Sequence, residues 1–373
     1  MERIGVVGLG AMGLGIAQLY AQAGFDVIAT DAQPATRASA PARIRTGLEP
    51  RIAAGKLAPE AAEALLARIS IVDSPARTAA ADLIVEAIIE DLAVKRRLLG
   101  ELEAAAGPQA VLATNTSALS VTALAEGLSR PGRLIGLHFF NPAPVMKLVE
   151  LIAHPGSSPD ALALAQALTE RAGKRVIRCA DRPGFIVNRC ARPFYGEALA
   201  LLEEGRSASD IDAAMLAAGY RMGPFALIDL IGADVNLAAT EGLSRAMGVH
   251  PRYHVFDALR QQVAAGDLGR KTGRGFLFPA APGPAPADAA AIRLRIEAML
   301  ANEAASLLAE GAVSADDIDS ALKLGMNFPR GPFESARVLG LDKVRAELAR
   351  LAAAAPPALR GRYDISPVLA AMG

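Results

Sequence analysis

The segment from residue 3 to residue 31 constrains the fold more than any other part of the chain. It reads RIGVVGLGAMGLGIAQLYAQAGFDVIATD, which is an apolar strand, a glycine turn, a helix, Gly24, a second strand and the acid Asp31. This order predicts a βαβ unit, in which the helix joins two parallel strands.

The turn GLGAMG has the spacing G-x-G-x-x-G. Gly8 permits a tight turn, Gly10 lets a pyrophosphate approach the backbone, and Gly13 lets the helix pack close to the strand. The helix N-terminus offers N–H groups to the phosphates. Asp31 is placed for the adenosine ribose, which favours NAD over NADP. A glycine turn in another α/β protein is the open alternative. The predicted cofactor residues of the turn are Gly8, Leu9, Gly10, Ala11, Met12 and Gly13.

Strands and helices then alternate along the chain. Residues 34–69 are expected to be helical, with breaks at Gly47 and Gly55. The predicted strands lie at 81–89, 110–113, 134–140 and 147–153. This alternation predicts a mostly parallel, doubly wound sheet, the α/β Rossmann-type arrangement.

The apolar periodicity becomes helical throughout after Pro183. A segment rich in Pro, Ala and Gly follows at 279–290 and indicates a linker. The expected organisation is a nucleotide-binding domain at 1–182, an all-α domain at 183–280, a linker at 281–290 and a partial helical repeat at 291–373.

The evidence for that repeat is internal similarity. Residues 302–334 resemble residues 196–228 at an offset of 106 to 108 residues. Asp319 aligns with Asp212, and both copies carry the tripeptide GPF. We expect each copy to place its DID at a helix start and to end its helical pair at Gly-Pro.

Composition excludes several classes of partner. The chain has 39 basic and 39 acidic residues, so no basic field attracts nucleic acid or a membrane surface. The two cysteines, Cys179 and Cys190, are too few for a disulfide framework or a zinc site, and no metal is predicted. The chain starts directly in a strand and has no long apolar run, so we expect neither a signal peptide nor a membrane span, and a cytoplasmic location.

The stretch HFFNPAPVMKLVE raises a question of proton chemistry. Removing a hydride from an alcohol also requires a base for the hydroxyl proton, and histidine suits that role. His138 ends a predicted strand, and a Pro-rich loop leads to the strand that carries Glu150. A carboxylate there would orient the imidazole. The open alternative is a core histidine and a surface glutamate.

A polar stretch, TNTS, follows the strand at 110–113. Ligands of doubly wound folds bind at the carboxyl ends of strands. Asn115 is therefore a candidate for the nicotinamide ribose and Ser117 for the reacting oxygen. Ser117 as a helix N-cap is equally compatible with the sequence.

Together these residues resemble the 3-hydroxyacyl-CoA dehydrogenase family. The motifs GLGAMG, VEAIIED, ATNTSAL, GLHFFNPAPVMKLVE, RPGFIVNR and GRKTGRGF occur in this order within residues 1 to about 280. The resemblance implies a Rossmann-type domain, a helical C-terminal domain and an active site between them. It also implies NAD as the cofactor and an acyl-CoA as the substrate.

Site residues follow from the resemblance position by position. It implies that His138 is the general base with Glu150 as its partner, and that Ser117 and Asn188 hold substrate oxygens. Further NAD contacts are implied at Glu90, Lys95, Asn115, Ser117, Asn141 and Lys271.

The resemblance also implies a site for the coenzyme A phosphates. Arg51 and Lys56 lie where the family's helical arm meets the coenzyme, although a plain surface charge is an equal alternative for each. The second helical copy lacks RPGFIVNR and so has no counterpart of Asn188. We expect it to be structural and to pack on the first copy as a partner subunit would, in place of the partner of a homodimer. A homodimer is the open alternative.

The predicted activity is NAD-dependent oxidation of a (3S)-3-hydroxyacyl-CoA to the 3-oxoacyl-CoA and its reverse, with a short acyl chain such as 3-hydroxybutyryl. One alternative is a β-hydroxyacid dehydrogenase, which acts on free acids and uses a lysine. The other is a non-catalytic NAD-binding protein, against which the set Ser117, His138, Glu150 and Asn188 argues.

Overall fold

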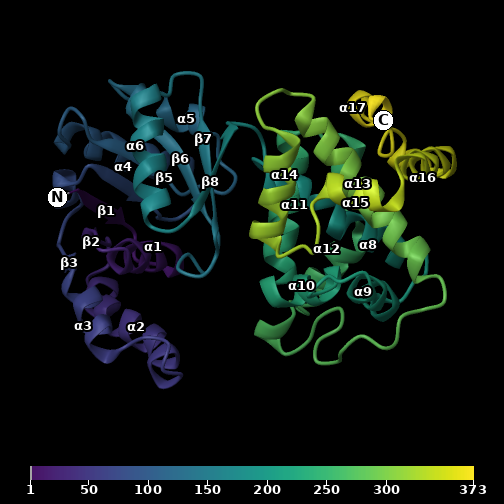
Figure 1. The fold of residues 1–373 in the computed structure, drawn as a ribbon, viewed down its shortest axis with the longest axis horizontal. Coiled ribbons are helices and arrows are strands. Elements are labelled where there is room, and N and C mark those ends of the chain that lie inside the picture. The colour runs from purple at the N-terminus through teal and green to yellow at the C-terminus, as the bar shows by residue number, and fades with distance from the viewer. Residues whose placement is uncertain (1) are drawn as a thin grey trace. The chain divides into compact units, whose positions relative to one another are not determined.

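The computed structural model describes residues 2–373 (Figure 1). The chain folds into two compact units, Met1–Arg182 and Pro183–Gly373. The first unit is built on a sheet, and the second is helical. Both predicted fold types are therefore confirmed.

The first unit contains one sheet of eight strands in the order β3-β2-β1-β4-β5-β6-β7-β8. All neighbouring pairs are parallel except β6 and β7. The strand order changes direction between β1 and β4. Doubly wound sheets bind ligands at such a point, outside the carboxyl ends of the strands. The strands are β1 (Arg3–Val7), β2 (Asp26–Thr30), β3 (Ile69–Ile71), β4 (Leu83–Glu86), β5 (Val111–Thr114), β6 (Leu134–Phe139), β7 (Leu148–Ala153) and β8 (Arg175–Ala180).

Helices connect these strands. They are α1 (Ala11–Gln22), α2 (Pro34–Ala53), α3 (Pro59–Ala67), α4 (Leu92–Ala105), α5 (Val121–Ala125) and α6 (Pro159–Arg171), with short 3-10 helices at Pro75–Ala80 and Pro131–Arg133. The helices α2 and α3 form a pair beyond the β3 edge of the sheet (Figure 1). The core between sheet and helices is apolar and fully buried, with Ile4, Val6 and Ile16 at 0% exposure.

Two sequence expectations for residues 34–69 are wrong. Gly47 does not break the helix, because α2 runs through it to Ala53. A single glycine costs a helix about 1 kcal/mol relative to alanine, which packing of Ile44 and Leu48 offsets. Gly55 does end the helical run, with φ at +66°. Ile69 belongs to strand β3 rather than to a helix.

The second unit is all-helical. Its helices are α7 (Val187–Cys190), α8 (Arg192–Glu203), α9 (Ala208–Ala217), α10 (Pro224–Ile231), α11 (Ala233–Ala246), α12 (Asp257–Ala264), α13 (Ala289–Leu308), α14 (Ala315–Met326), α15 (Pro332–Leu339), α16 (Leu341–Ala354) and α17 (Pro367–Ala371). Short 3-10 helices lie at Pro251–Tyr253, Arg270–Thr272 and Pro357–Leu359. Helix α13 is central and packs against α8, α9, α15, α16 and α17.

The two similar sequence segments have the same local structure. In the first, the Asp212 carboxylate accepts hydrogen bonds from the N–H groups of Phe225 (2.9 Å) and Ala226 (2.8 Å). In the second, Asp319 accepts from Phe333 (2.8 Å) and Glu334 (3.1 Å). Each of these aspartates therefore caps the next helix. Asp210 and Asp317, the first residues of the two DID segments, lie in the first turns of α9 and α14, so the prediction that DID stands at a helix start is confirmed.

The Gly-Pro pairs correct one expectation for the repeat. Gly223 is the N-cap of α10 and Pro224 its first residue, and Gly331 and Pro332 do the same for α15. Gly-Pro therefore begins a helix here instead of ending one, because proline needs no N–H partner in the first turn. A Cβ atom on Gly223 would lie 2.2 Å from Cγ of Asp212, so the cap requires glycine.

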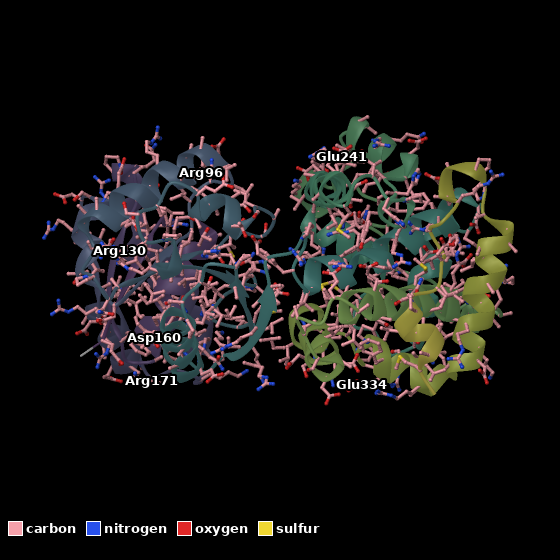
Figure 2. The ribbon with its side chains drawn as sticks, turned by 90° about the horizontal axis from the view of Figure 1, so that it is seen from above. Arg96, Arg130, Asp160, Arg171, Glu241 and Glu334 are labelled. Carbon is pink, nitrogen blue, oxygen red and sulfur yellow. The ribbon has the colours of Figure 1, made fainter. Side chains whose placement is uncertain are left out.

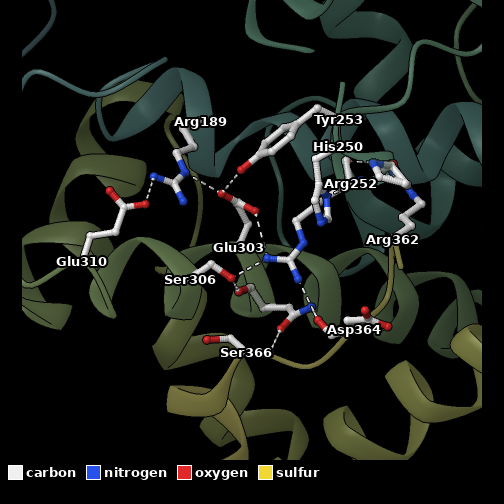
Figure 3. Close-up of polar contacts among 12 residues, drawn as sticks. Arg189, His250, Arg252, Tyr253, Glu303, Ser306, Glu310, Arg362, Asp364 and Ser366 are labelled. Atoms are coloured by element: carbon white, nitrogen blue, oxygen red, sulfur yellow. Dashed lines mark hydrogen bonds and ion pairs between the residues drawn. The ribbon is translucent and has the colours of Figure 1, made fainter. Parts of the chain in front are cut away.

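Ion pairs join the two helical copies in a reciprocal pattern, and Figure 3 shows one side of it, with Arg189 between Glu303 and Glu310. Arg189 pairs with Glu303 and Glu310, both at 2.6 Å. Arg295 pairs with Glu197 (2.9 Å) and Glu204 (2.6 Å). These six residues correspond at the offset of 106 that relates the sequence copies.

A second set of contacts repeats the same exchange. The Tyr253 hydroxyl donates to Glu303 at 2.6 Å, and Arg252 lies 3.4 Å from that carboxylate. Arg362 pairs with Glu197 at 2.7 Å, and the Tyr363 hydroxyl donates to Glu197 at 3.3 Å. Reciprocal contacts of this kind are typical of isologous interfaces between identical subunits. Here they lie within one chain.

The surface of each unit carries charged side chains. Arg130, Asp160 and Arg171 point outward from the first unit (Figure 2). Within residues 2–373, no helix combines the length and the apolar character needed to cross a membrane.

Candidate active site

The glycine turn joins β1 to α1 and has a close backbone approach. Gly8 has φ at +98°, a conformation that favours glycine. A Cβ atom on Gly13 would lie 1.7 Å from the Gly8 carbonyl oxygen. By contrast, a Cβ atom on Gly10 would meet nothing within 4 Å. The turn is therefore packed at Gly8 and Gly13 and open at Gly10, beside the N–H groups that begin α1.

Asp31 lies directly beside this turn. Its carboxylate accepts hydrogen bonds from the N–H groups of Leu9 and Gln33, both at 2.8 Å. Leu9 itself is buried, whereas Ala11 is exposed and Met12 is half-buried at the start of α1. The backbone thus holds the Asp31 carboxylate in place next to the open side of the turn, and a carboxylate has acceptor sites beyond these two.

His138 and Glu150 form a buried pair. They lie opposite each other in the antiparallel register of β6 and β7. Nδ1 of His138 lies 2.6 Å from Oε2 of Glu150. The histidine is 6% exposed and the glutamate 0%. The prediction that the hairpin brings them together is confirmed, and the alternative of a surface glutamate is wrong.

The loop after β5 contacts the end of β6. Oδ1 of Asn115 accepts a hydrogen bond from the Phe139 N–H at 2.9 Å, one residue from His138. The Asn115 N–H donates to the Glu86 carbonyl at 2.8 Å. Asn115 therefore ties three neighbouring strands together at their carboxyl ends.

Glu90 organises the start of the next segment. Its carboxylate accepts from the Thr116 hydroxyl (2.6 Å) and from the Ser117 N–H (2.9 Å). Burial, the largest influence, raises the pKa of Glu90, but the Thr116 hydrogen bond and the Lys95 charge outweigh it, so that its pKa is lowered. The Ser117 side chain is exposed, and its hydroxyl lies 3.5 Å from the same carboxylate.

Lys95 is buried in a network that the sequence did not reveal. Its Nζ lies 2.6 Å from Glu86 and 3.3 Å from Glu90. Lys95 and Glu86 are both 0% exposed. Glu86 also accepts from the Thr114 hydroxyl at 2.7 Å. Lys95 is therefore neither an exposed helix lysine nor directed at solvent, and Glu86 is a missed member of the site.

The loop that follows Phe140 is held from two sides. The Lys174 ammonium donates to the carbonyl oxygens of Ala143 (2.6 Å) and Met146 (2.5 Å). On the other side, a Cβ atom on Gly15 of α1 would lie 3.3 Å from Pro144. Burial lowers the pKa of Lys174 to about 8. Asn141, which is exposed, begins this loop.

The remaining predicted residues lie elsewhere on the two units. Arg51, near the end of α2, donates to the Gln22 side chain at 3.2 Å, and Lys56 is exposed after α2. Asn188 is half-buried in α7 of the helical unit. Lys271 is 2.6 Å from Asp234, at the start of α11.

Comparison with protein families agrees with this geometry. Residues 3–182 match the model of the 3-hydroxyacyl-CoA dehydrogenase NAD binding domain. Residues 184–278 and again 292–373 match the model of the 3-hydroxyacyl-CoA dehydrogenase C-terminal domain. Both matched segments of the helical unit thus correspond to one domain model.

Individual proteins are also similar to this chain in sequence. The 3-hydroxyadipyl-CoA dehydrogenase of Escherichia coli (strain K12) is 42% identical over 277 residues, which cover 74% of this chain and 58% of that protein. The mitochondrial hydroxyacyl-coenzyme A dehydrogenase of Sus scrofa is 39% identical over 285 residues, with 74% of this chain and 90% of that protein covered.

A solved structure matches nearly the whole chain. The crystal structure of 3-hydroxybutyryl-CoA dehydrogenase from Escherichia coli K12 superposes with a TM-score of 0.91 at 31% identity, and 99% of this chain and 97% of that chain are covered. From the eight-stranded sheet, the buried His138–Glu150 pair and these similarities together, the chain belongs to the 3-hydroxyacyl-CoA dehydrogenase family.

Proposed function

We propose that the chain interconverts a short-chain (3S)-3-hydroxyacyl-CoA, such as 3-hydroxybutyryl-CoA, and the corresponding 3-oxoacyl-CoA. The observation that carries the proposal is the buried His138–Glu150 pair, with 2.6 Å between Nδ1 and Oε2, in a member of this NAD-dependent family. The similarity to 3-hydroxybutyryl-CoA dehydrogenase over 99% of the chain supports the short acyl group.

The residues of the glycine turn fit a dinucleotide. The space at Gly10 and the N–H groups at the start of α1 suit a pyrophosphate, and Asp31 suits the ribose hydroxyls. Bound NAD supplies the hydride acceptor. Gly8 and Gly13 keep the turn tight. Further residues proposed to form the cofactor site, by contact or by supporting a contact residue, are Glu90, Lys95, Asn115, Ser117, Asn141 and Lys271.

Two of these residues act through others. Lys95 is enclosed by Glu86 and Glu90, so its role is to hold the Glu90 carboxylate that accepts from the Ser117 N–H. Asn115 accepts from the Phe139 N–H and so fixes the backbone beside His138. Both residues therefore support the loop that carries Ser117.

His138 handles the proton in the proposed mechanism. In oxidation, Nε2 of His138 takes the proton of the 3-hydroxyl group as the hydride leaves C3. Glu150 accepts from Nδ1–H, which selects the tautomer that leaves Nε2 as the base, and its charge stabilises the imidazolium that forms. In reduction, the same imidazolium returns the proton to the 3-oxo oxygen.

Substrate contacts are proposed for four residues. Ser117 and Asn188 hydrogen-bond oxygens near the reacting carbon, while Arg51 and Lys56 contact the coenzyme A phosphates. The resemblance supports the first two. For Arg51 and Lys56 the support is their charge and their position near the end of α2.

A substrate panel tests the proposal. NADH consumption is measured with acetoacetyl-CoA, free acetoacetate and a 3-oxodicarboxylyl-CoA, and NADPH replaces NADH in a parallel series. We expect rapid turnover only with acetoacetyl-CoA and NADH. Preference for the dicarboxylyl thioester would replace the short-chain assignment by one like that of the 3-hydroxyadipyl-CoA relative. Turnover of free acetoacetate would favour a β-hydroxyacid dehydrogenase, and no turnover at all would favour a non-catalytic protein.

We further propose a domain division at 1–182, 183–280 and 291–373, with a linker at 281–290. We also propose that the chain is cytoplasmic and that it is a monomer. The reciprocal ion pairs of Arg189 and Arg295 support monomeric behaviour, since they bury within one chain the kind of contacts that two subunits exchange. Light scattering that gives the mass of a dimer would contradict the proposed monomer if residues 183–280 hold that dimer together.

A further inference from the structure

A small cavity lies inside the helical unit, between α8, α11 and the segment around Tyr253. Three arginines line it, Arg192, Arg252 and Arg362, together with His254 and Thr240. No acidic residue is among the residues that line it. The space is about what one water molecule needs, so it holds no more than one small ion or molecule.

Two of the three arginines are balanced by carboxylates. Arg362 lies 2.7 Å from Glu197. Arg252 lies 3.4 Å from Glu303 (Figure 3). Both glutamates are fully buried. Their charges are shared with Arg295 and Arg189, so neither carries negative charge to spare for a further cation.

Among the described residues, Arg192 has no carboxylate to balance its charge, and its guanidinium lies 5.3 Å from the centroid of the neutral Tyr195 ring. It is only 8% exposed, and within residues 2–373 no carboxylate lies within 4.0 Å of its guanidinium. Its Nη1 donates to the Thr240 hydroxyl at 3.1 Å. Nε of Arg192 and Nε of Arg252 are both buried without an acceptor in the part of the chain described. Burial lowers the pKa of Arg192, but a guanidinium remains charged at any working pH.

Comparison of the two helical copies shows how the imbalance arises. At the offset of 106, Arg192 corresponds to Ala298, and Gly196 corresponds to Asn302. The Asn302 side chain fills its site and bonds the Asp364 carbonyl and the Ser366 N–H. Gly196 instead leaves room for Arg362, whose Nη2 would lie 2.7 Å from an added Cβ atom. The first copy therefore carries Arg192, a cation that the second copy lacks, without an additional acidic residue to pair with it.

We infer that this cavity binds one small monovalent anion, of the size of chloride, between Arg192 and Arg252. A water molecule could accept from the two Nε–H groups, but it would leave the charge of Arg192 uncompensated. An unpaired buried charge is far more costly than an unpaired buried dipole, so a counter-ion is favoured over water. His254 adds no negative charge, and it faces the positive charge of Arg362.

Halide dependence of thermal unfolding tests the inference. Sodium chloride replaces sodium gluconate at constant ionic strength, so general screening stays the same. We expect the Tm of the wild-type chain to rise by about 3 °C or more, since an ion that binds only the folded state stabilises it. Arg192→Met should lose this rise. Arg221→Met, which removes an exposed arginine and the same charge, should keep it.

Crystals soaked in sodium bromide give an independent readout on the wild-type chain. An anomalous peak between Arg192 and Arg252 is expected. This measurement decides the question even if Arg192→Met fails to fold. The inference is overturned if the wild type shows no halide-specific rise in Tm, if Arg192→Met responds as the wild type does, or if the cavity holds only water in bromide.

Discussion

Replacing Glu150 by glutamine tests the role of its charge. The change preserves shape in a site where the carboxylate is 0% exposed. With 2.6 Å between Nδ1 and Oε2, the charge centres of an imidazolium and the carboxylate lie about 4 Å apart, which is worth about 4 kcal/mol at an effective dielectric constant of about 20. Because this attraction exists only when His138 holds the proton, its loss falls on the transition state. We expect kcat to fall about 10³-fold.

The assay is steady-state oxidation of 3-hydroxybutyryl-CoA by NAD, the direction in which His138 gains the proton, together with a fluorescence titration of NADH binding. We expect NADH affinity to stay unchanged in Glu150→Gln, because the proposed role of the pair is proton transfer, whereas the glycine turn is proposed to hold the pyrophosphate. Glu170→Gln, an exposed glutamate of α6, is the matched control and should keep full activity. A Glu150→Gln variant that is folded and within threefold of the wild-type kcat would refute the argument.

Three further sets of variants give measurable results. Gly13→Ala should lower the thermal stability strongly, because its Cβ would lie 1.7 Å from the Gly8 carbonyl oxygen. Gly10→Ala should leave thermal stability intact and weaken NADH binding. If the two variants changed stability and NADH binding equally, this interpretation of the turn would be contradicted. Lys95→Met should cost about 3–5 kcal/mol in urea unfolding, since it strands the buried Glu86 carboxylate, and exposed Lys56→Met should cost almost nothing. Burial lowers the pKa of Lys174 to about 8, so between that pH and about 10.5 the unfolded chain binds more protons and wild-type stability should rise with pH by up to about 1.4 kcal/mol per unit. Lys174→Met should remove that rise, and an identical slope in both proteins would show that Lys174 does not cause it.

Sequence reasoning succeeds where the residues of a site are close together in the sequence. The glycine turn and Asp31 lie within one βαβ unit, so their relative placement follows from the order of elements. His138 and Glu150 are joined by a short loop, and a hairpin with a buried face has one register that puts both side chains on the same side. These parts could therefore be predicted from residue types and spacing.

The buried ion pair of Lys95 and Glu86 could not be predicted in this way. Glu86 reads as one polar residue in an apolar strand, and Lys95 reads as a helix residue that faces solvent. Their contact depends on how α4 packs against the sheet, which is a tertiary property. A charged residue inside an apolar strand was the available signal, because such a residue needs a buried partner.

The reciprocal ion pairs of the helical unit were also missed, although the sequence held a signal for them. Arg295 stands at the repeat offset from Arg189, within the segment that replaces RPGFIVNR. The two copies therefore share the arginine while only the first has Asn188. Packing of one copy on the other turns that shared arginine into a reciprocal contact with Glu197.

The short strands β3 and β8 illustrate a different limit. β3 has only three residues, Ile69–Ile71, and its pairing with β2 is what makes it a strand. In β8 the exposed Arg175 and Arg178 are separated by two buried residues, so its burial lacks the two-residue period of a typical strand, and it ends just before the helical unit begins. Neither has a turn signal of the kind that marks a hairpin, so the sheet is wider than the pattern of apolar runs indicates.

The most direct test of the account is the activity of His138→Gln beside the wild-type chain, with acetoacetyl-CoA and NADH. The account predicts rapid turnover by the wild type, and in the variant a loss of at least about 10³-fold in kcat with NADH binding retained, because the base that exchanges the substrate proton is gone. A folded His138→Gln variant that reduces acetoacetyl-CoA at the wild-type rate would contradict the assignment of His138 as the base.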